Sequence, residues 1–166
     1  MAVITGYASI FEQPYEMHDT FGPYQEVVDP GAFDASLNSG PDVVLRMNHT
    51  GSPLASTYAG SLEVWADDTG LGFRAEVDDA RSDVADLVIG IRNGDIRETS
   101  MAGRIRRGKW SPDYEEYRLL EFSLDRGDVG PVTFGANPAG HVALDAAADT
   151  EHERDVILLS AALAVA

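Results

Sequence analysis

The alternation of apolar and polar residues along the chain predicts a series of strands. Residues 1–11 are rich in β-branched and aromatic types and carry no charge, which predicts a buried strand. Residues 61–65 and 72–77 alternate on either side of Asp67-Asp68-Thr69-Gly70, which predicts a hairpin. The polar stretch at residues 12–24 is expected to be a loop.

Helical spacing occurs in two segments. An apolar residue recurs every three or four positions across residues 83–92, and Asn93-Gly94 follows, so a helix is expected to end there. A shorter helix is expected to begin at Asp29-Pro30, since aspartate caps free amides and proline suits the first helical position. Phe33 would face inward from this helix.

The remaining apolar segments predict more strands and define the fold class. Residues 43–47, 95–107, 116–124 and 129–134 have strand patterns, and residues 111–113 form a polar turn between the second and third. Many strands with two helices favour an α+β domain, built around a curved antiparallel sheet or a closed β-barrel surrounded by a few helices.

The composition changes at Gly135, where alanine, aspartate and glutamate become dominant. We therefore expect one compact domain over residues 1–143. Residues 144–166 would then form an acidic, alanine-rich linker with a terminal helix over residues 155–166.

Charge and composition narrow the classes of partner and chemistry. Twenty-eight acidic and twelve basic residues give a net charge of −16, which argues against nucleic acid or an anionic membrane as partner. The apolar run at residues 156–166 is shorter than the roughly 20 residues that span a bilayer. Cysteine is absent, so any nucleophile must be an oxygen or nitrogen group. Without a cationic start for secretion, the chain is interpreted as intracellular.

Two residues stand out as candidates for catalysis. His49 ends an apolar strand and precedes a turn, a position where active-site groups are often held. Ser100 begins a predicted strand and is followed by the small residues Ala102 and Gly103, which leave room for a substrate backbone. Taken singly, a histidine or serine in such a position is more often bonded to the backbone.

Half of the basic residues cluster within 22 positions. They are Arg97, Arg104, Arg106, Arg107, Lys109 and Arg118. The simple interpretation is that they neutralise nearby carboxylates, and the sharper alternative is a site for an acidic peptide. The sequence has no phosphate-binding loop, dinucleotide fingerprint or calcium loop, so no cofactor or metal is implied.

Six short stretches between residues 4 and 139 share the order and spacing of a known family. They are Gly6-Tyr7-Ala8, residues 26–33 (Glu-Val-Val-Asp-Pro-Gly-Ala-Phe), residues 42–49 ending in Asn48-His49, residues 68–73 (Asp-Thr-Gly-Leu-Gly-Phe), residues 91–96 followed by Ser100, and residues 132–139. Together they resemble the prohead maturation serine protease family of tailed phages, which is distantly similar to the herpesvirus capsid assembly protease. The resemblance implies a herpesvirus-protease-like fold.

The resemblance also implies site residues. It makes Ser100 the nucleophile and His49 the general base, with Asp128, in Asp128-Val129-Gly130-Pro131, as the third member. Glu121 and His141 remain as alternatives to Asp128. Two departures from the family pattern are Gly130, where serine is frequent, and Met101-Ala102-Gly103 in place of Phe-Gly-Phe. Backbone amides near Gly103 and Arg104 are expected to form the oxyanion hole.

The function implied by the resemblance is capsid maturation. The chain would be a serine endopeptidase that cleaves scaffolding or capsid-protein N-terminal segments and itself, inside the assembling procapsid in the host cytoplasm. Its partner would be the capsid or scaffolding protein as substrate, and assembly into a homo-oligomer stays open. The alternative function is a catalytically inactive, protease-like scaffold or capsid assembly chaperone.

Overall fold

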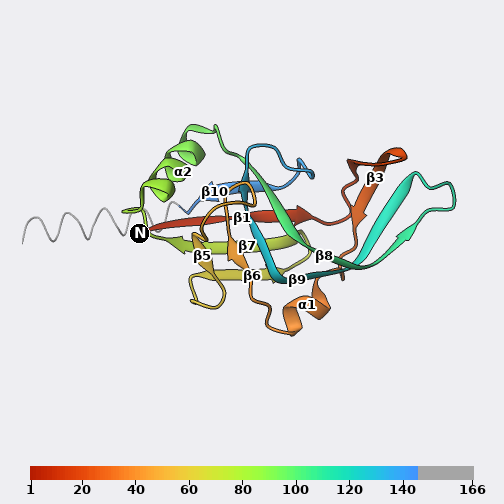
Figure 1. Cartoon of the computed structure of the whole chain (residues 1–166), viewed down its shortest axis with the longest axis horizontal. Helices are drawn as coiled ribbons and strands as arrows, with labels where there is room; N and C mark the ends of the chain where they lie inside the picture. The colour runs from red at the N-terminus through yellow and green to blue at the C-terminus, as the bar shows by residue number, and fades with distance from the viewer. Residues whose placement is uncertain (146–166) are drawn as a thin grey trace, which may run out of the picture.

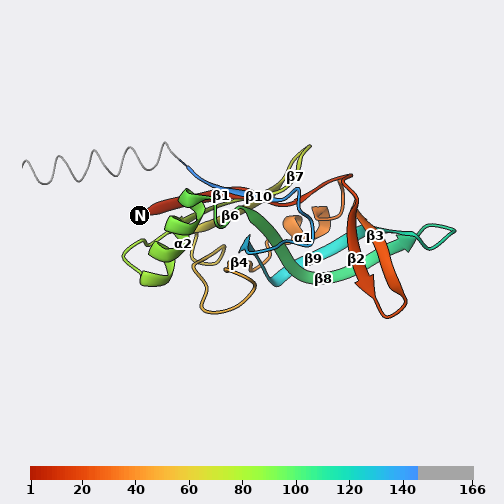
Figure 2. The same cartoon turned by 90° about the horizontal axis from the view of Figure 1, so that it is seen from above.

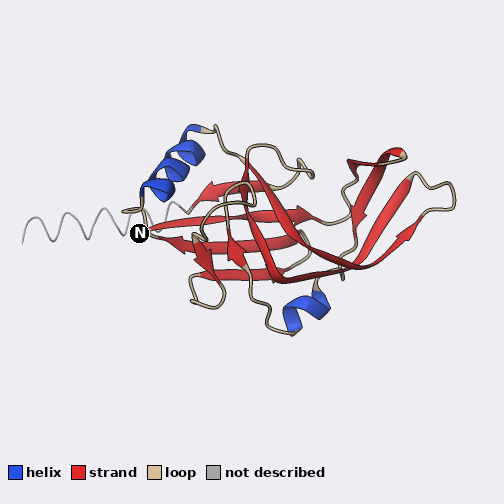
Figure 3. Cartoon of the chain, in the orientation of Figure 1, coloured by secondary structure: helices blue, strands red, loops and turns tan. Residues whose placement is uncertain are grey.

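The computed structural model describes residues 1–145 and, within them, contains two β-sheets and two helices (Figures 1 and 3). The first sheet has the strand order β10-β1-β7-β6. Its strands are β1 (Ala2–Ile10), β6 (Leu62–Ala66), β7 (Gly70–Val77) and β10 (His141–Leu144). All of its pairings are antiparallel. The strand predicted at residues 1–11 and the hairpin predicted around residues 67–70 are therefore confirmed.

The second sheet is mixed, with the strand order β2-β3-β9-β4-β5 and β8 paired to β9. Its strands are β2 (Tyr15–Asp19), β3 (Gly22–Val28), β4 (Val44–Leu45), β5 (Ala55–Ser56), β8 (Glu98–Trp110) and β9 (Glu116–Val132). The strand β9 runs antiparallel to β8 and parallel to both β3 and β4. The expectation of an antiparallel sheet is thus wrong for this half of the domain, although the α+β class holds.

The closed-barrel alternative is also wrong, because the strands of the described chain form two open sheets. β4 and β5 have only two residues each. Asn48 and His49 have positive φ angles of 52° and 55° directly after β4, and Pro53 has no amide to donate just before β5. The pairing of β4 with β5 therefore stops after two residue pairs. This edge of the second sheet cannot extend to close a barrel.

The stretch at residues 12–24 is a hairpin rather than the expected loop. β2 and β3 pair from Tyr15 opposite Glu26 to Asp19 opposite Gly22. The Asp19 carboxylate accepts the Phe21 amide at 2.7 Å and closes the turn. Polar residues obscured this hairpin in the sequence because most of its outer face is exposed.

The helices are α1 (Asp34–Asn38) and α2 (Ser82–Asn93). α2 buries the predicted apolar stripe and ends at Gly94, whose φ of 79° is the left-handed conformation that glycine adopts most easily. α1 begins one turn later than predicted, because residues 29–32 form a tight turn closed by the Ala32 amide on the Asp29 carbonyl. Phe33 is fully buried, as predicted.

One apolar core lies between the two sheets and includes the buried residues of α2. Its largest fully buried side chains are Phe33, Phe73, Ile4, Leu45, Leu71, Leu119 and Leu124. The β2–β3 and β8–β9 hairpins extend beyond this core on the side away from α2 (Figures 1 and 2). β10 continues the domain to Leu144. The expected linker and helix lie almost wholly at residues 146–166, outside the described residues.

Candidate active site

The strand β9 lies between β8 and β4 where the candidate catalytic residues gather. Ser100 of β8 is opposite Gly130, and Ala102 is opposite Asp128. Residues two apart on a strand face the same side of a sheet, as do directly opposed residues. Ser100 and Asp128 therefore have side chains on one face, on neighbouring strands.

His49 reaches this face from the turn after β4. Asn48 anchors the turn to the end of β9, where its amide donates to the Pro131 carbonyl at 3.0 Å. The Thr133 amide donates to Asn48 Oδ1 at 2.8 Å, and Asn48 Nδ2 donates to Thr133 Oγ1 at 3.2 Å. These bonds stabilise two consecutive residues in the left-handed region, which L side chains rarely occupy.

His49 and Asp128 are in direct contact. His49 Nδ1 lies 2.5 Å from Asp128 Oδ1, and Asp128 is only 5% exposed. Arg46 Nη1 lies 3.9 Å from the other carboxylate oxygen. A buried carboxylate held in this way fixes the ring orientation and tautomer, and leaves Nε2 free for a proton acceptor's role.

The structure brings Ser100 to the same face but does not bond it to the ring. Ser100 is half-buried, and no hydrogen bond joins its hydroxyl to His49 in the described part of the chain. Catalytic hydrogen bonds are often long before substrate binds. The register between β8 and β9 shifts at Gly103, so this residue has no opposite partner. The oxyanion hole near Gly103 and Arg104 stays a prediction.

Gly130 allows β4 and β9 to approach closely beside the site. A Cβ atom built on Gly130 would lie 2.3 Å from the Arg46 carbonyl oxygen, and its φ is 154°. The Arg46 amide donates to the Val129 carbonyl at 3.2 Å. Position 130, where the family frequently has serine, is therefore in tight backbone contact with Arg46, three residues before His49.

The two alternatives to Asp128 have other neighbours. Glu121 is half-exposed, and its carboxylate lies 3.7 Å from Arg107 Nε. His141 begins β10, and its ring packs on Tyr7 with centroids 5.6 Å apart. Neither side chain has a hydrogen bond to His49 within the described residues.

A hollow of about 330 Å³ opens beside Ser100, and Gly103 and Ile105 of β8 also line it. Its buried wall includes Glu26 of β3, which accepts a hydrogen bond from the Tyr15 hydroxyl. Burial raises the pKa of the Glu26 carboxyl, and the Tyr15 bond partly opposes that shift. Burial and then Glu26 raise the pKa of Tyr15 in turn.

No role was predicted for Glu26, although it begins the family-like stretch of residues 26–33. A glutamate directly before the apolar pair Val27-Val28 gave a signal that could have been followed, because charged side chains are seldom fully buried without a function or a partner. Its partner, Tyr15, lay in the segment expected to be a loop. The pairing of β2 with β3 was therefore not available from the sequence pattern.

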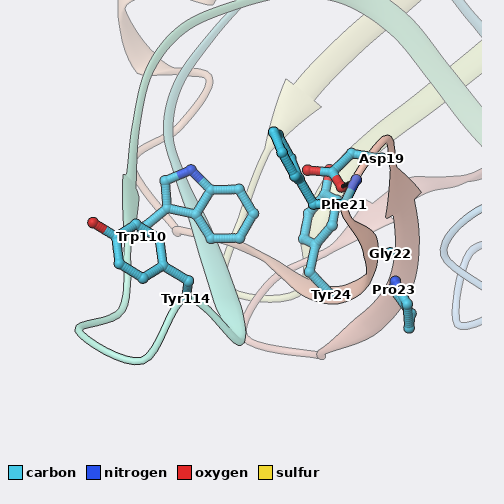
Figure 4. Close-up of a pocket in the computed structure, with 7 residues that line it drawn as sticks. All are labelled: Asp19, Phe21, Gly22, Pro23, Tyr24, Trp110 and Tyr114. Carbon is cyan, nitrogen blue, oxygen red and sulfur yellow. Dashed lines mark hydrogen bonds between the residues drawn. The ribbon is translucent and has the colours of Figure 1, made fainter.

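A second hollow lies between the tips of the two long hairpins (Figure 4). Trp110 and Tyr114 of the β8–β9 hairpin face Phe21 and Tyr24 of the β2–β3 hairpin. The Trp110 and Tyr24 rings pack with centroids 5.0 Å apart. Tyr24 also lines the hollow beside Ser100, so the two hollows share one wall.

The basic cluster divides into paired and unpaired members. Arg97, Arg107 and Arg118 lie within 4 Å of carboxylates, with Arg118 Nη1 2.5 Å from Glu12 Oε1. No carboxylate of the described residues lies within 4 Å of Arg104, Arg106 or Lys109. Neutralisation therefore accounts for half of the cluster, and the rest is free cationic surface along β8.

Neither a metal-binding side-chain cluster nor a helix able to cross a bilayer occurs in residues 1–145. An α+β domain with a histidine–carboxylate pair beside a strand serine has the residue types of a serine hydrolase. The model of the Caudovirus prohead serine protease family matches residues 1–155, and the chain belongs to this family. At the level of the family, this means a serine protease that acts on capsid proteins in the assembling phage procapsid. Neither the curated proteins nor the solved structures gave a match.

Proposed function

We propose that this chain is an active serine endopeptidase, with Ser100 as nucleophile, His49 as general base and Asp128 as the residue that orients His49. The observation that carries the proposal is the 2.5 Å contact between His49 Nδ1 and Asp128, on the sheet face shared with Ser100. A serine hydroxyl is a weak nucleophile until a neutral imidazole takes its proton. Ser100 therefore needs the His49 ring as proton acceptor, and His49 in turn needs Asp128 to fix its orientation.

The proposed reaction has two balanced halves. Ser100 Oγ bonds to the substrate carbonyl carbon while its proton passes to His49 Nε2, and the imidazolium is stabilised by Asp128. The carbon–nitrogen bond then breaks, and the leaving amine takes that proton. In the second half, water gives a proton to His49 and bonds to the acyl carbon. The bond from that carbon to Ser100 Oγ then breaks, His49 returns the proton to Oγ, and the acid product leaves.

The proposed substrates are scaffolding or capsid-protein N-terminal segments and the chain itself. Self-cleavage would fall in the segment after the described domain, around residues 144–166. Intact mass of a longer expressed protein, compared with Ser100→Ala, tests this. Equal C-terminal ends in the two proteins would show that the processing does not depend on Ser100.

An inactive assembly scaffold is the second candidate function. The observation that favours it is the lack of a Ser100–His49 hydrogen bond in the described chain, together with the free cationic surface on β8. An inactive scaffold has no need of a reactive serine. Reactivity of Ser100 therefore separates the two candidates.

Labelling with a fluorophosphonate at neutral pH measures that reactivity. We expect wild type to be labelled once, at Ser100, and labelling to be lost in Ser100→Ala and in His49→Ala. Ser52→Ala and His18→Ala change exposed residues of the same types and should label like wild type. A folded wild-type protein that does not react would favour the scaffold.

A further inference from the structure

The hollow beside Ser100 contains a buried carboxylate without a cationic partner. Glu26 is 5% exposed, and its one hydrogen bond within the described residues comes from the Tyr15 hydroxyl to Oε1. No arginine, lysine or histidine of residues 1–145 lies within 4 Å of this carboxylate. A buried carboxylate is costly unless it is paired or hydrogen-bonded. Because Tyr15 donates only to Oε1, the Glu26 carboxylate can accept further hydrogen bonds from a bound donor.

A second polar group in the same hollow has no partner. Ser9 of β1 is 1% exposed, and its hydroxyl makes no hydrogen bond within the described chain. It lines the hollow together with Glu26. Buried polar atoms of native proteins are nearly always hydrogen-bonded, so this orphaned hydroxyl is an independent sign that a ligand completes the site.

The rest of the hollow suits an aliphatic chain. Met17, Leu119 and Phe122 are among its apolar lining residues, and Leu119 and Phe122 are buried. The hollow thus combines an apolar lining with the polar groups of Glu26 and Ser9. A lysine or arginine side chain matches this combination, since its methylene stem packs on apolar surface and its cationic end donates hydrogen bonds. The volume of about 330 Å³ is at the lower end of ligand pockets, which is adequate for one long side chain.

The position of the hollow indicates which substrate residue would enter it. A serine nucleophile attacks the carbonyl carbon of the residue on the acyl side of the scissile bond, whose Cα is bonded directly to that carbon. Its side chain is therefore the one that begins nearest to Ser100, and Ser100 lines the hollow.

We propose that this hollow is the specificity pocket for the acyl-side residue and selects lysine or arginine, with Glu26 as the ion partner and Ser9 as an additional acceptor. The inference rests on the proposed function, because it requires Ser100 to be the nucleophile. The unpaired carboxylate then acquires its counter-charge only when substrate binds.

Diphenyl phosphonate esters test the pocket directly, since they carry a chosen acyl-side side chain and bond covalently to an active serine. The rates of Ser100 modification are compared for probes with a lysine side chain, a norleucine side chain, which has the lysine stem without its amine, and a glutamate side chain. We expect the lysine probe to react at least tenfold faster than the norleucine probe, and the glutamate probe to be slowest. Equal rates for lysine and norleucine would overturn the pocket assignment.

Variants assign the selectivity to Glu26. In Glu26→Gln the ratio of lysine to norleucine rates should fall to about one, and in Ser9→Ala it should fall by a smaller factor. Glu16→Gln makes the same change at an exposed position on β2 and should keep the wild-type ratio. A ratio within one variant is independent of that variant's overall reactivity, and the wild-type comparison holds even if a variant does not fold.

The two proposals fail in different ways. If the fluorophosphonate does not label wild-type Ser100, the proposed function and the pocket assignment both fall. If that probe labels Ser100 but the phosphonates show no preference for a cation, the protease stands and the pocket assignment is wrong.

Discussion

His49 and Asp128 are 79 positions apart in the chain, yet His49 Nδ1 and Asp128 Oδ1 lie 2.5 Å from each other. The contact exists because β4 pairs in parallel with the part of β9 that contains Asp128. Since Val44 lies opposite Asp128 and Asn48 bonds to Pro131 further along β9, the turn at Asn48 and His49 then directs the histidine ring back to the carboxylate. Neither Glu121 nor His141 has such a relationship to His49.

Asp128→Asn is expected to lower the rate of fluorophosphonate labelling by about 10³ to 10⁴-fold, because an amide favours the wrong tautomer of His49. Thermal unfolding checks that the variant folds. Glu121→Gln and His141→Gln are the matched comparisons and should label within a few-fold of wild type. A larger loss in either of these than in Asp128→Asn would make that residue the orienting group.

Asn48→Ala is expected to slow labelling by about tenfold to a hundredfold, since a small misplacement of a catalytic group has effects of this order. The substitution removes two side-chain bonds to Thr133 that hold the turn. Asn48→Asp keeps the Oδ1 acceptor for the Thr133 amide and should recover part of the rate. Equal rates for the two variants would mean that the Thr133 amide bond does not position His49.

Gly130→Ala is expected to lower the free energy of unfolding by about 1 to 3 kcal/mol, as overpacking typically does. Its Cβ would overlap the Arg46 carbonyl oxygen, 2.3 Å away. Urea denaturation measures the change. Gly31→Ala is the control, because its Cβ would meet its nearest atom at an ordinary 3.6 Å. Similar losses in both variants would contradict the close approach at Gly130.

Asp67 makes stability depend on pH in the acid range. Hydrogen bonds, first from the Tyr7 hydroxyl and then from the Thr69 amide, lower the pKa of Asp67 from 3.8 to about 2. The depressed pKa means that its contribution is present above pH 3.8 and is lost as the pH falls towards 2.

Asp67→Asn should therefore lower the unfolding temperature near pH 7, and its difference from wild type should shrink as the pH falls from about 4 towards 2. Thermal unfolding followed by circular dichroism across this range measures the effect. Asp68→Asn, a neighbouring exposed carboxylate, should show no such trend. A constant difference between Asp67→Asn and wild type would exclude the linkage.

Local patterns predicted those elements whose residues alternate or repeat within one segment. The β6–β7 hairpin and α2 were predicted because their apolar positions define a face without reference to other segments. β3 and β10 were missed because they pair with distant strands, and β2 was missed because its mostly exposed, polar residues form no strong pattern. The periodicity of the sequence likewise could not predict the parallel pairing of β4 with β9, because the two strands are far apart in the chain.

The candidate site divides in a similar way. His49, Ser100 and Asp128 were named from the sequence, since the six stretches have a definite order and spacing. Glu26, Ser9 and the hollow that they share were not, because β1 and β3 belong to different sheets and only the folded chain brings their side chains together.

The 17-residue strand β9 carries Leu119 and Phe122 in the hollow and Asp128 beside His49. Between Phe122 and Asp128 the ladder with β8 is interrupted, because Ser123 lies opposite Arg104 and Asp128 lies opposite Ala102, and Arg126 has a positive φ of 56°. The length of this irregular segment decides where Asp128 lies relative to Phe122. Changes in chain length are therefore expected to be tolerated at the turn of residues 111–115 and rejected within this interval. β9 thus sets the spacing between the proposed specificity pocket and the proposed catalytic pair.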